Sequence, residues 1–354
     1  MTTMQAARQS SLYVGIDTHK DQHHAAVLDS TGMKLGDLEF QATTAGYRDL
    51  AKWLGTLGSI ELVGMECSGS FGAGLTRFLR ERDVDVREIN MPHRHLRARV
   101  GKTDPIGAEA AARKVLSGSF TVKPKDTTGI VESIRLLSAA RNSAVKAKAS
   151  AIVQLKCILV TVPASLRESI DSQYGTVKHC ATLRPDMTRL DEPLQSSKYT
   201  LRTLARRIRV LETEIADHDK ELKALVQEVA PTLLTRVGIG PVHAAQLIVT
   251  AGQNLDRMKS DAAFARLCGV APIPASSGQT RRMRLHKGGH RQANRSLHLI
   301  AVVRLRYDPR TRAYMERRQK EGLSKKDVLR CLKRFIAREV FYDLKHDLLT
   351  QSGT

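Results

Sequence analysis

The chain has 354 residues, of which 42% are apolar, so it can form two or three domains with hydrophobic cores. Its formal net charge of +21 favours polyanions, and nucleic acid is the expected partner. It has no run of about 18 apolar residues and no lipid-anchor motif, so we expect no membrane association. Five widely spaced cysteines without a C-x-x-C pair argue against a zinc knuckle and are typical of reduced thiols in a cytoplasm.

The first third of the chain alternates strand and helix patterns. Short apolar or alternating runs predict strands, and longer amphipathic runs predict helices. We expect strands at 12–17, 24–29 and 35–40, a helix at 47–57, a strand at 61–66, a helix at 72–82, a strand at 84–90 and a helix at 105–116. Three strands followed by βαβ units resemble the ribonuclease H fold, so we predict a RuvC-like α/β domain over residues 1–125.

Three acidic residues stand where these predicted elements end or begin. Asp17 ends the first strand, Glu66 ends the fourth, and Asp104 opens the following helix. The carboxyl ends of neighbouring strands meet at one edge of an open sheet, and carboxylates gathered there repel each other unless a cation lies between them. We therefore predict a metal site at these acids. Because Pro105 favours the first helical position, an N-cap is the alternative role of Asp104.

A helical, coiled-coil middle region is expected over residues 126–230. Apolar residues at steps of three and four form a seam from Leu201 to Val229, with a polar break at His218 that we interpret as a packing residue. A helix at about 130–162 is a candidate antiparallel partner, and a second subunit is an equal one. Residues 163–193, rich in Pro, Ser and Thr, predict the tip of this region or a loop.

The last region, residues 231–354, is expected to be mainly helical, and it carries most of the excess charge. From 281 to 345, 20 Lys and Arg stand against 6 Asp and Glu, a net of +14. The turn at Gly238 and Gly240 resembles a helix–hairpin–helix element, whose backbone N–H groups approach a phosphate. Salt-dependent contacts with nucleic-acid backbones are expected at Arg317, Arg318, Lys325, Lys326, Arg330, Lys333 and Arg334. Aromatic residues, at 4%, argue against a base-stacking platform.

Several motifs occur together in the order of one known family. They are Gly15-Ile16-Asp17-Thr18-His19-Lys20, Glu66-Cys67-Ser68-Gly69, Lys102-Thr103-Asp104, and the stretch from Gly269 to Gly278 followed by Arg281-Arg282 and by His286 to Arg291. The chain resembles the insertion-sequence transposases that carry a RuvC-like domain with a DEDD acid set and are related to the Piv DNA invertases. The resemblance covers nearly the whole chain.

The resemblance implies a DNA recombinase guided by a structured RNA, often called bridge RNA, which pairs with both donor and target DNA. It implies Mg²⁺ bound by Asp17, Glu66 and Asp104, and a C-terminal serine transposase domain whose nucleophile matches Ser277. It also implies a homo-oligomer, a dimer or a tetramer, with active sites assembled between subunits. We expect such an enzyme in the bacterial cytoplasm, associated with the nucleoid.

A serine that attacks a DNA phosphodiester forms a phosphoserine link, which conserves bond energy for rejoining. The metal is expected to polarise the phosphate or to help deprotonate Ser277. Ser276 is the competing nucleophile if the register shifts by one. Basic residues that follow the serine are expected to bind nucleic acid: Arg281, Arg282, Arg284, Lys287 and Arg291. Of these, Arg281, Arg282 and Arg284 are also expected to stabilise charge on the phosphate oxygens.

One position departs from the family pattern. The acid set ends in Asp-x-x-Asp, but this chain has glycine at the last position, Gly107. Positions i and i+3 share a helix face, so the missing acid would face the same metal as Asp104. Glu109 lies roughly 140° around the helix from Asp104 and does not replace it. We therefore predict weakened metal binding.

Other functions compete with this interpretation. A RuvC-like nuclease would cut with metal-activated water and leave no covalent adduct. A nucleic-acid-binding protein made inert by Gly107 would bind without strand exchange. An actin-like sugar kinase also begins with Gly-Ile-Asp, but it requires Asp-x-Gly where this chain has Asp17-Thr18-His19, so we reject it.

Overall fold

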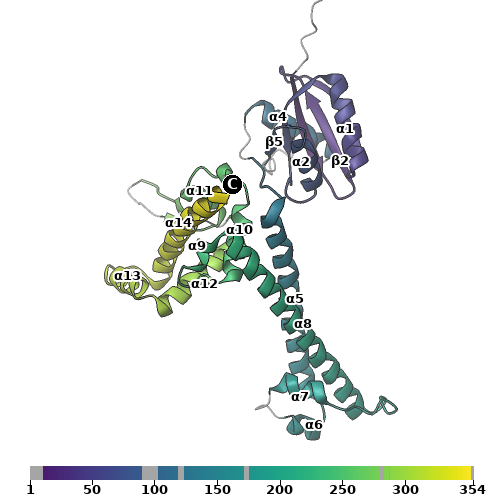
Figure 1. Cartoon of the computed structure of the whole chain (residues 1–354), viewed down its shortest axis with the longest axis vertical. Coiled ribbons are helices and arrows are strands. Elements are labelled where there is room, and N and C mark those ends of the chain that lie inside the picture. Colours follow the sequence, from purple (N-terminus) through teal and green to yellow (C-terminus); the bar gives the residue numbers. More distant parts are fainter. Residues whose placement is uncertain are drawn as a thin grey trace, which may run out of the picture. The chain divides into compact units, whose positions relative to one another are not determined.

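The protein is described by a computed structural model that covers residues 11–89, 103–118, 123–170, 175–278, 283–286 and 288–351, with only the backbone of residue 285 and of 349–351. Two compact units divide the chain. The sheet unit runs up to Thr128 and also includes the distant segment Gly252–Lys259, whereas the helical unit consists of Gly129–Ala251 and the residues from Ser260 onward. Figure 1 draws both units. No helix in the described ranges is long and apolar enough to cross a membrane.

The sheet unit contains one five-stranded mixed sheet with helices on both faces (Figure 1). In chain order its elements are β1 Ser11–Thr18, β2 Gln22–Leu28, β3 Lys34–Gln41, α1 Thr44–Leu57, β4 Ser59–Met65, α2 Ala73–Arg80, β5 Val86–Glu88 and α4 Asp104–Leu116. The strand order is β3-β2-β1-β4-β5; β1 pairs antiparallel with β2 and β2 with β3, while β1 pairs parallel with β4 and β4 with β5. The element types predicted for 12–116 are confirmed, although the strand expected at 84–90 is shorter and position 90 lies outside the described residues.

The sheet unit is held together by two apolar layers. On one face, Val14 and Ile16 of β1 pack with residues of α1 and α2, including Leu50 and Leu75, and all four are fully buried. On the other face, α4 packs against β1 and β4. The glycine in the middle of β1, Gly15, makes this possible, because a Cβ there would lie 2.0 Å from the carbonyl oxygen of Ala108. The close approach fixes the start of α4 over the carboxyl end of β1.

The helical unit is mostly α-helix, with one small two-stranded sheet (Figure 1). Its elements are α5 Gly129–Thr161, α6 Ala164–Ser169, α7 Thr176–Thr182, α8 Pro193–Val229, α9 Pro231–Leu234, α10 Pro241–Ala251, α11 Asp261–Leu267, β6 Pro272–Pro274, β7 Met283–Leu285, α12 Arg291–Tyr307, α13 Pro309–Lys320 and α14 Lys325–Gln351. A short 3₁₀ turn, Leu255–Arg257, lies between α10 and α11 and belongs to the sheet unit.

The two long helices α5 and α8 pack against each other, as Figure 1 shows. Arg141 forms an ion pair with Asp219, and Lys148 forms one with Glu212, so the two helices run antiparallel. Within the described chain α5 is therefore a partner of the apolar seam of α8, which was one of the two alternatives from the sequence. The apolar seam residues are buried or half-buried, and the side chain of His218 is 22% exposed.

Residues 163–170 and 175–193 lie at the tip of the α5–α8 pair (Figure 1). The expectation of a plain loop is wrong for part of this stretch, because it contains the short helices α6 and α7. Leu166 of α6 and Cys180 of α7 are buried in one cluster with Leu201 of α8. This burial stabilises helices that are too short to form alone, and composition does not reveal it.

Candidate metal centre and nucleic-acid interface

Two of the predicted acids reach one sheet edge because of the strand register. Ile16 of β1 lies opposite Met65 of β4 in a parallel pair, so the residues that follow, Asp17 and Glu66, stand at corresponding positions. The hydroxyl of Thr18 donates a hydrogen bond to the main-chain oxygen of Glu66 at 2.9 Å, which fastens the two strand ends to each other. This edge is the carboxyl end of both strands, where ligands of open α/β sheets bind.

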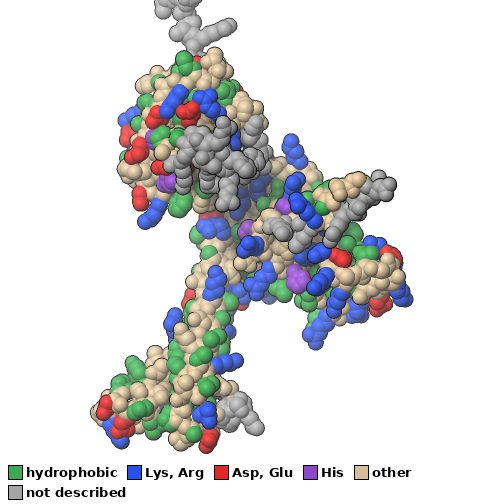
Figure 2. Space-filling model, turned by 180° about the vertical axis from the view of Figure 1, so that it is seen from behind, with side chains coloured by type: hydrophobic (Ala, Val, Ile, Leu, Met, Phe, Trp, Pro, Cys, Tyr) green, Lys and Arg blue, Asp and Glu red, His purple; other side chains and the backbone are tan. Residues whose placement is uncertain are grey.

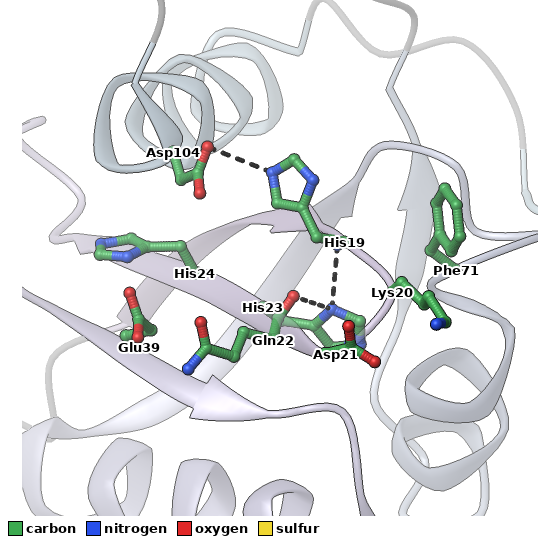
Figure 3. A pocket seen from close by; sticks show the side chains of 9 residues that line it. All are labelled: His19, Lys20, Asp21, Gln22, His23, His24, Glu39, Phe71 and Asp104. Atoms are coloured by element: carbon green, nitrogen blue, oxygen red, sulfur yellow. Dashed lines mark hydrogen bonds and ion pairs between the residues drawn. The ribbon is translucent and has the colours of Figure 1, made fainter.

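The third acid comes from the start of α4. Asp104 is the first helical residue, and Thr103 is the N-cap, so the alternative role of Asp104 as the N-cap is wrong. His19, in the turn after β1, approaches it: His19 Nε2 lies 3.1 Å from Asp104 Oδ1 and 3.8 Å from Asp17 Oδ1. Figure 3 shows the His19 imidazole directed at the Asp104 carboxylate.

These three side chains form a group that suits a divalent cation. Asp17, His19 and Asp104 each offer one ligand atom, and the three atoms lie within 4.8 Å of one another. His19 and Asp104 also line an open cleft of about 410 Å³, together with the rest of the β1–β2 turn, residues of β2 and β3, and Phe71, which follows β4 (Figure 3). Two carboxylates and an imidazole are a donor set that divalent metals accept, and the open cleft leaves room for further ligands.

The predicted ligand Glu66 lies outside this group. Its side chain is buried, at 8% exposure. Its negative charge acts on Lys114 of α4, whose pKa is lowered by burial and raised back in part by Glu66. It also acts on Glu88 of β5, whose pKa is raised mainly by burial. The structure thus brings Asp17 and Asp104 together with His19, a residue that the sequence analysis did not include among the metal ligands.

Position 107 faces the same group. A Cβ built on Gly107 would lie 2.4 Å from Asp17 Oδ2, so the Asp17 carboxylate occupies the place that a side chain would take. The nearby Glu109 pairs with Arg113 instead: its carboxylate accepts hydrogen bonds from the Arg113 guanidinium at 2.7 and 3.0 Å. A side chain at position 107 would therefore point at Asp17, and the effect of the missing acid on metal binding stays a prediction.

A segment from the second half of the chain completes the sheet unit. Asn254 donates a hydrogen bond to the main-chain oxygen of Pro124 and accepts one from the main-chain N–H of Asp126, both at 2.9 Å. Arg257 stands next to Glu88: burial lowers the pKa of Arg257 and raises that of Glu88, and their opposite charges act against both shifts. Sequence reasoning missed this segment, since nothing in its composition assigns it to the sheet.

The helix–hairpin–helix element has the expected outline in the helical unit. The four-residue α9 and the longer α10 flank a turn in which Gly238 has a φ of 82°, a left-handed conformation that favours glycine. Gly240 has open space around the position of a Cβ. A Cβ on Gly238 would instead lie 3.2 Å from the main-chain oxygen of Ile300 and 3.3 Å from the Val303 side chain, so the turn is open at Gly240 only. Contact with a phosphate stays a prediction.

A half-buried histidine joins α10 to α12. His243 Nδ1 lies 3.3 Å from the hydroxyl oxygen of Ser296, which is 5% exposed. Burial lowers the pKa of His243 below its ordinary value of 6.5, and the positive charges of Arg295 and Arg141 lower it further. The folded helical unit therefore favours the neutral imidazole.

This histidine predicts a pH dependence of stability. Because the pKa of His243 is lower in the folded than in the unfolded chain, the unfolded chain binds more protons below about pH 6.5, and the free energy of unfolding falls as the pH drops. The variant His243→Gln removes this contribution. Urea unfolding between pH 7.5 and 5.0 should show a smaller loss of stability in the variant than in the unchanged protein. Equal losses in both would contradict the assignment.

The predicted nucleophile Ser277 is exposed, in the loop that follows β6. β6 pairs antiparallel with β7, and the pair places Arg284 opposite Ile273. No hydrogen bond to the Ser277 hydroxyl is formed by any residue that the structure describes. The predicted contacts Arg281, Arg282 and Lys287 lie outside the described residues.

Arg291 stands at the entrance of a second cleft. It is the first residue of α12, and with His286, His290, Arg295 and His298 it lines a cleft of about 520 Å³. The side chains that line this cleft are imidazoles, guanidiniums and an amide, and none is acidic. Its composition suits an anion, in agreement with the predicted role of Arg291 in binding nucleic acid.

The predicted basic residues on α13 and α14 differ in whether their side chains pair with neighbouring residues. Lys325 and Lys326 are exposed in the first turn of α14. The others contact neighbours within the helical unit: Arg317 and Arg318 pair with Glu321, Arg330 with Asp327, and Arg334 with Asp261, while Lys333 donates to Asn294. Figure 2 shows Lys and Arg side chains over the visible face of these helices, with few acidic ones.

These two lysines predict a change in salt dependence. The double variant Lys325→Ala, Lys326→Ala should reduce the slope of log affinity for DNA against log salt by about 1 to 2, because each phosphate contact contributes roughly 0.9. The matched control Lys220→Ala, Lys223→Ala removes two exposed lysines from α8. Fluorescence anisotropy with duplex DNA at several salt concentrations measures both slopes. An equal change in the control would mean that the effect depends on net charge alone.

Comparison with known proteins shows which transposases this chain is similar to. A model of DEDD transposases of IS110 elements, described as "Transposase", matches residues 14–163. A second model, described as "Transposase IS116/IS110/IS902 family", matches residues 230–316. The "Insertion element IS900 uncharacterized 42 kDa protein" of Mycobacterium paratuberculosis is 29% identical over 122 residues, which span 34% of this chain and 31% of that protein.

The two matched stretches overlap both units: residues 14–163 cover most of the sheet unit and the start of the helical unit, and residues 230–316 lie mainly in the helical unit but include the segment Gly252–Lys259 of the sheet unit. These two stretches of the chain are thus similar to domains of insertion-sequence transposases of the IS110 type.

Proposed function

We propose that this protein cuts and rejoins DNA as the transposase of an insertion sequence, through a covalent intermediate at Ser277 and under the guidance of a structured RNA. The observation that carries the proposal is the juxtaposition of Asp17 and Asp104 at the carboxyl edge of the sheet, in a chain similar to IS110 transposases. This similarity supports DNA as the substrate. The serine mechanism and the RNA follow from the resemblance of the C-terminal motifs.

The architecture of the sheet unit supports a RuvC-like fold. Three antiparallel strands lead into two parallel ones, the first strand is central, and α4 crosses the sheet with its first turn over the end of β1. This arrangement resembles the ribonuclease H fold, in which acids at the end of the first strand and on a later helix face one another. Asp17 and Asp104 occupy these two places, and Glu66 is on the neighbouring strand.

The residues that would hold a divalent cation are Asp17 and Asp104, and the resemblance implies Mg²⁺ with Glu66 as a further ligand. When bound, the cation would supply positive charge to the phosphate under attack. The role of the two carboxylates is to fix its position. The exposure of the Asp104 side chain, at 51%, leaves this edge accessible to a nucleic-acid strand.

The proposed reaction at Ser277 exchanges one ester bond for another. Its hydroxyl oxygen attacks the phosphorus of a DNA phosphodiester, a bond from Oγ to phosphorus forms, and one phosphorus–oxygen bond of the backbone breaks. The serine proton passes to a base or to water, and the departing deoxyribose oxygen takes up a proton. Attack by a deoxyribose hydroxyl of the other strand reverses these steps and restores the serine.

The strongly basic C-terminal helices support nucleic acid, DNA as well as RNA, as the partner in this reaction. Backbone contacts of exposed residues such as Lys325 and Lys326 would hold DNA or RNA without reading its sequence, so base pairing by the RNA would select donor and target. A homo-oligomer, a dimer or a tetramer, would assemble the active sites between subunits. The C-terminal motifs and Ser277 belong to the helical unit, and the acids belong to the sheet unit.

Trapping of the covalent intermediate tests the proposal. The protein is incubated with Mg²⁺, the RNA of the flanking element, and end-labelled donor and target DNA, and the products are separated on a denaturing gel. The expected result is a labelled protein–DNA adduct that proteinase converts to a short peptide–DNA product. Cleavage without any adduct would support the water-dependent nuclease instead, and tight binding without cleavage would support an inert binding protein.

A further inference from the structure

The metal group contains an imidazole, in a chain that lacks the fourth acid of the family pattern. The pattern calls for an acid at position 107, and Gly107 has no side chain to offer. His19 Nε2 instead lies within 4 Å of both described carboxylates of the group. The arrangement differs in chemistry from four acids, because one donor is nitrogen and neutral.

The main chain holds His19 in this position. Its N–H donates to the main-chain oxygen of Gln22 at 3.2 Å and to His23 Nδ1 at 3.3 Å, which closes the turn between β1 and β2. Figure 3 shows this link from His19 to His23, with the His19 ring on the opposite side toward Asp104. The side chain is 44% exposed, whereas its Nε2 atom is buried between the carboxylates and makes no hydrogen bond with the described residues.

The distances suit ligands on one ion. At bonds of about 2.1 Å, neighbouring ligands of an octahedral ion lie about 3 Å apart and opposite ones about 4.2 Å. His19 Nε2 is 3.1 Å from Asp104 Oδ1 and 3.8 Å from Asp17 Oδ1. Both distances fall in this range, so a cation can enter with small rotations of the side chains.

The other two imidazoles that line the cleft are engaged elsewhere. His24 Nε2 lies 3.0 Å from Asp37 Oδ2, and the pKa of Asp37 is lowered mainly by its hydrogen bond with Lys34 and further by this one with His24. His23 is 1% exposed and stacks on Tyr47 with 6.0 Å between ring centroids. Only His19, among the described histidines of this cleft, belongs to the metal group.

We propose that His19 is a metal ligand that takes the place of the absent acid at position 107, and that the site consequently prefers Mn²⁺ or Co²⁺ to Mg²⁺. Imidazole nitrogen suits the later first-row ions, whereas Mg²⁺ prefers oxygen donors and retains its water. The loss of one negative charge weakens binding of hard cations most. The inference rests on the proposed metal dependence of the sheet unit, but not on the serine reaction or on the RNA.

The test uses the full chain and the metal ions alone. Mn²⁺ bound to the unchanged protein should show electron spin-echo modulation from an imidazole ¹⁴N, and His19→Ala should abolish it. The control His24→Asn removes a neighbouring imidazole of the same cleft and should leave the modulation unchanged. Calorimetric titration should show that His19→Ala weakens Co²⁺ binding by about tenfold or more and Mg²⁺ binding by less than about threefold.

Three results would each overturn the proposal. They are bound Mn²⁺ without nitrogen modulation, equal losses of Co²⁺ and Mg²⁺ affinity in His19→Ala, and no Mn²⁺ binding at millimolar concentration. Circular dichroism and the melting temperature of the metal-free variants verify that they fold. No readout depends on recombination, so failure of the strand-exchange proposal would leave these results intact.

Discussion

Strand exchange by Ser277→Ala should fall by about 10³-fold or more, and the covalent protein–DNA adduct should disappear. The reason is that no other group can take over bond formation to phosphorus at the same position once the hydroxyl is removed. The substitution should cost little stability, because Ser277 is exposed and makes no hydrogen bond with the described residues. Binding of DNA and RNA should therefore remain within about twofold in the same preparation, as a shift assay would show.

The adjacent Ser276→Ala is the matched control, because it removes an identical hydroxyl one residue away. It should retain strand exchange. If Ser276→Ala is inactive and Ser277→Ala is active, the nucleophile is one position earlier than assigned. If both retain DNA cleavage without an adduct, water is the nucleophile and the RuvC-like nuclease becomes the better description.

Gly107→Asp should raise the affinity for Mg²⁺ by about tenfold and increase the rate of strand exchange, because it adds a carboxylate to a site with two. The new Cβ would lie 2.4 Å from Asp17 Oδ2, so the Asp17 side chain must rotate. The contact is with the end of a flexible side chain, so its rotation costs little free energy. A carboxylate in the first turns of α4 also interacts favourably with the helix dipole.

Gly107→Ala separates the two effects of this change. Alanine displaces Asp17 in the same way and supplies no acid, so Mg²⁺ affinity should fall below that of the unchanged protein. Calorimetric titration of the three proteins with Mg²⁺ measures the series. Equal affinities of the Asp and Ala variants would mean that position 107 does not face the ion. The prediction that the missing acid weakens metal binding would then be wrong.

The elements of the sheet unit could be predicted from the sequence because their signals are local. Alternating apolar residues and the flanking turns suffice to predict β1 to β3, and the parallel register then brings Asp17 and Glu66 to one edge. What the pattern does not reveal is the direction and engagement of a side chain. Glu66 is buried near Lys114 and Glu88, two residues whose proximity depends on how α4 and β5 pack.

His19 illustrates the opposite case. In sequence it is a polar residue in a turn, and a solvated loop explains it equally well. Its role in the metal group depends on the Gln22 and His23 contacts that close the turn and on the start of α4 above it. One signal was present: a histidine two residues after an acid that ends a strand, in a chain that lacks an acid elsewhere in the set.

The segment Gly252–Lys259 limits how this chain can be divided into separate parts. The chain passes between the units after Thr128, after Ala251 and after Lys259, whereas the two matched family domains cover 14–163 and 230–316. Each matched domain therefore contributes residues to both units. Exchange of either matched domain for that of another element would therefore replace residues of both units.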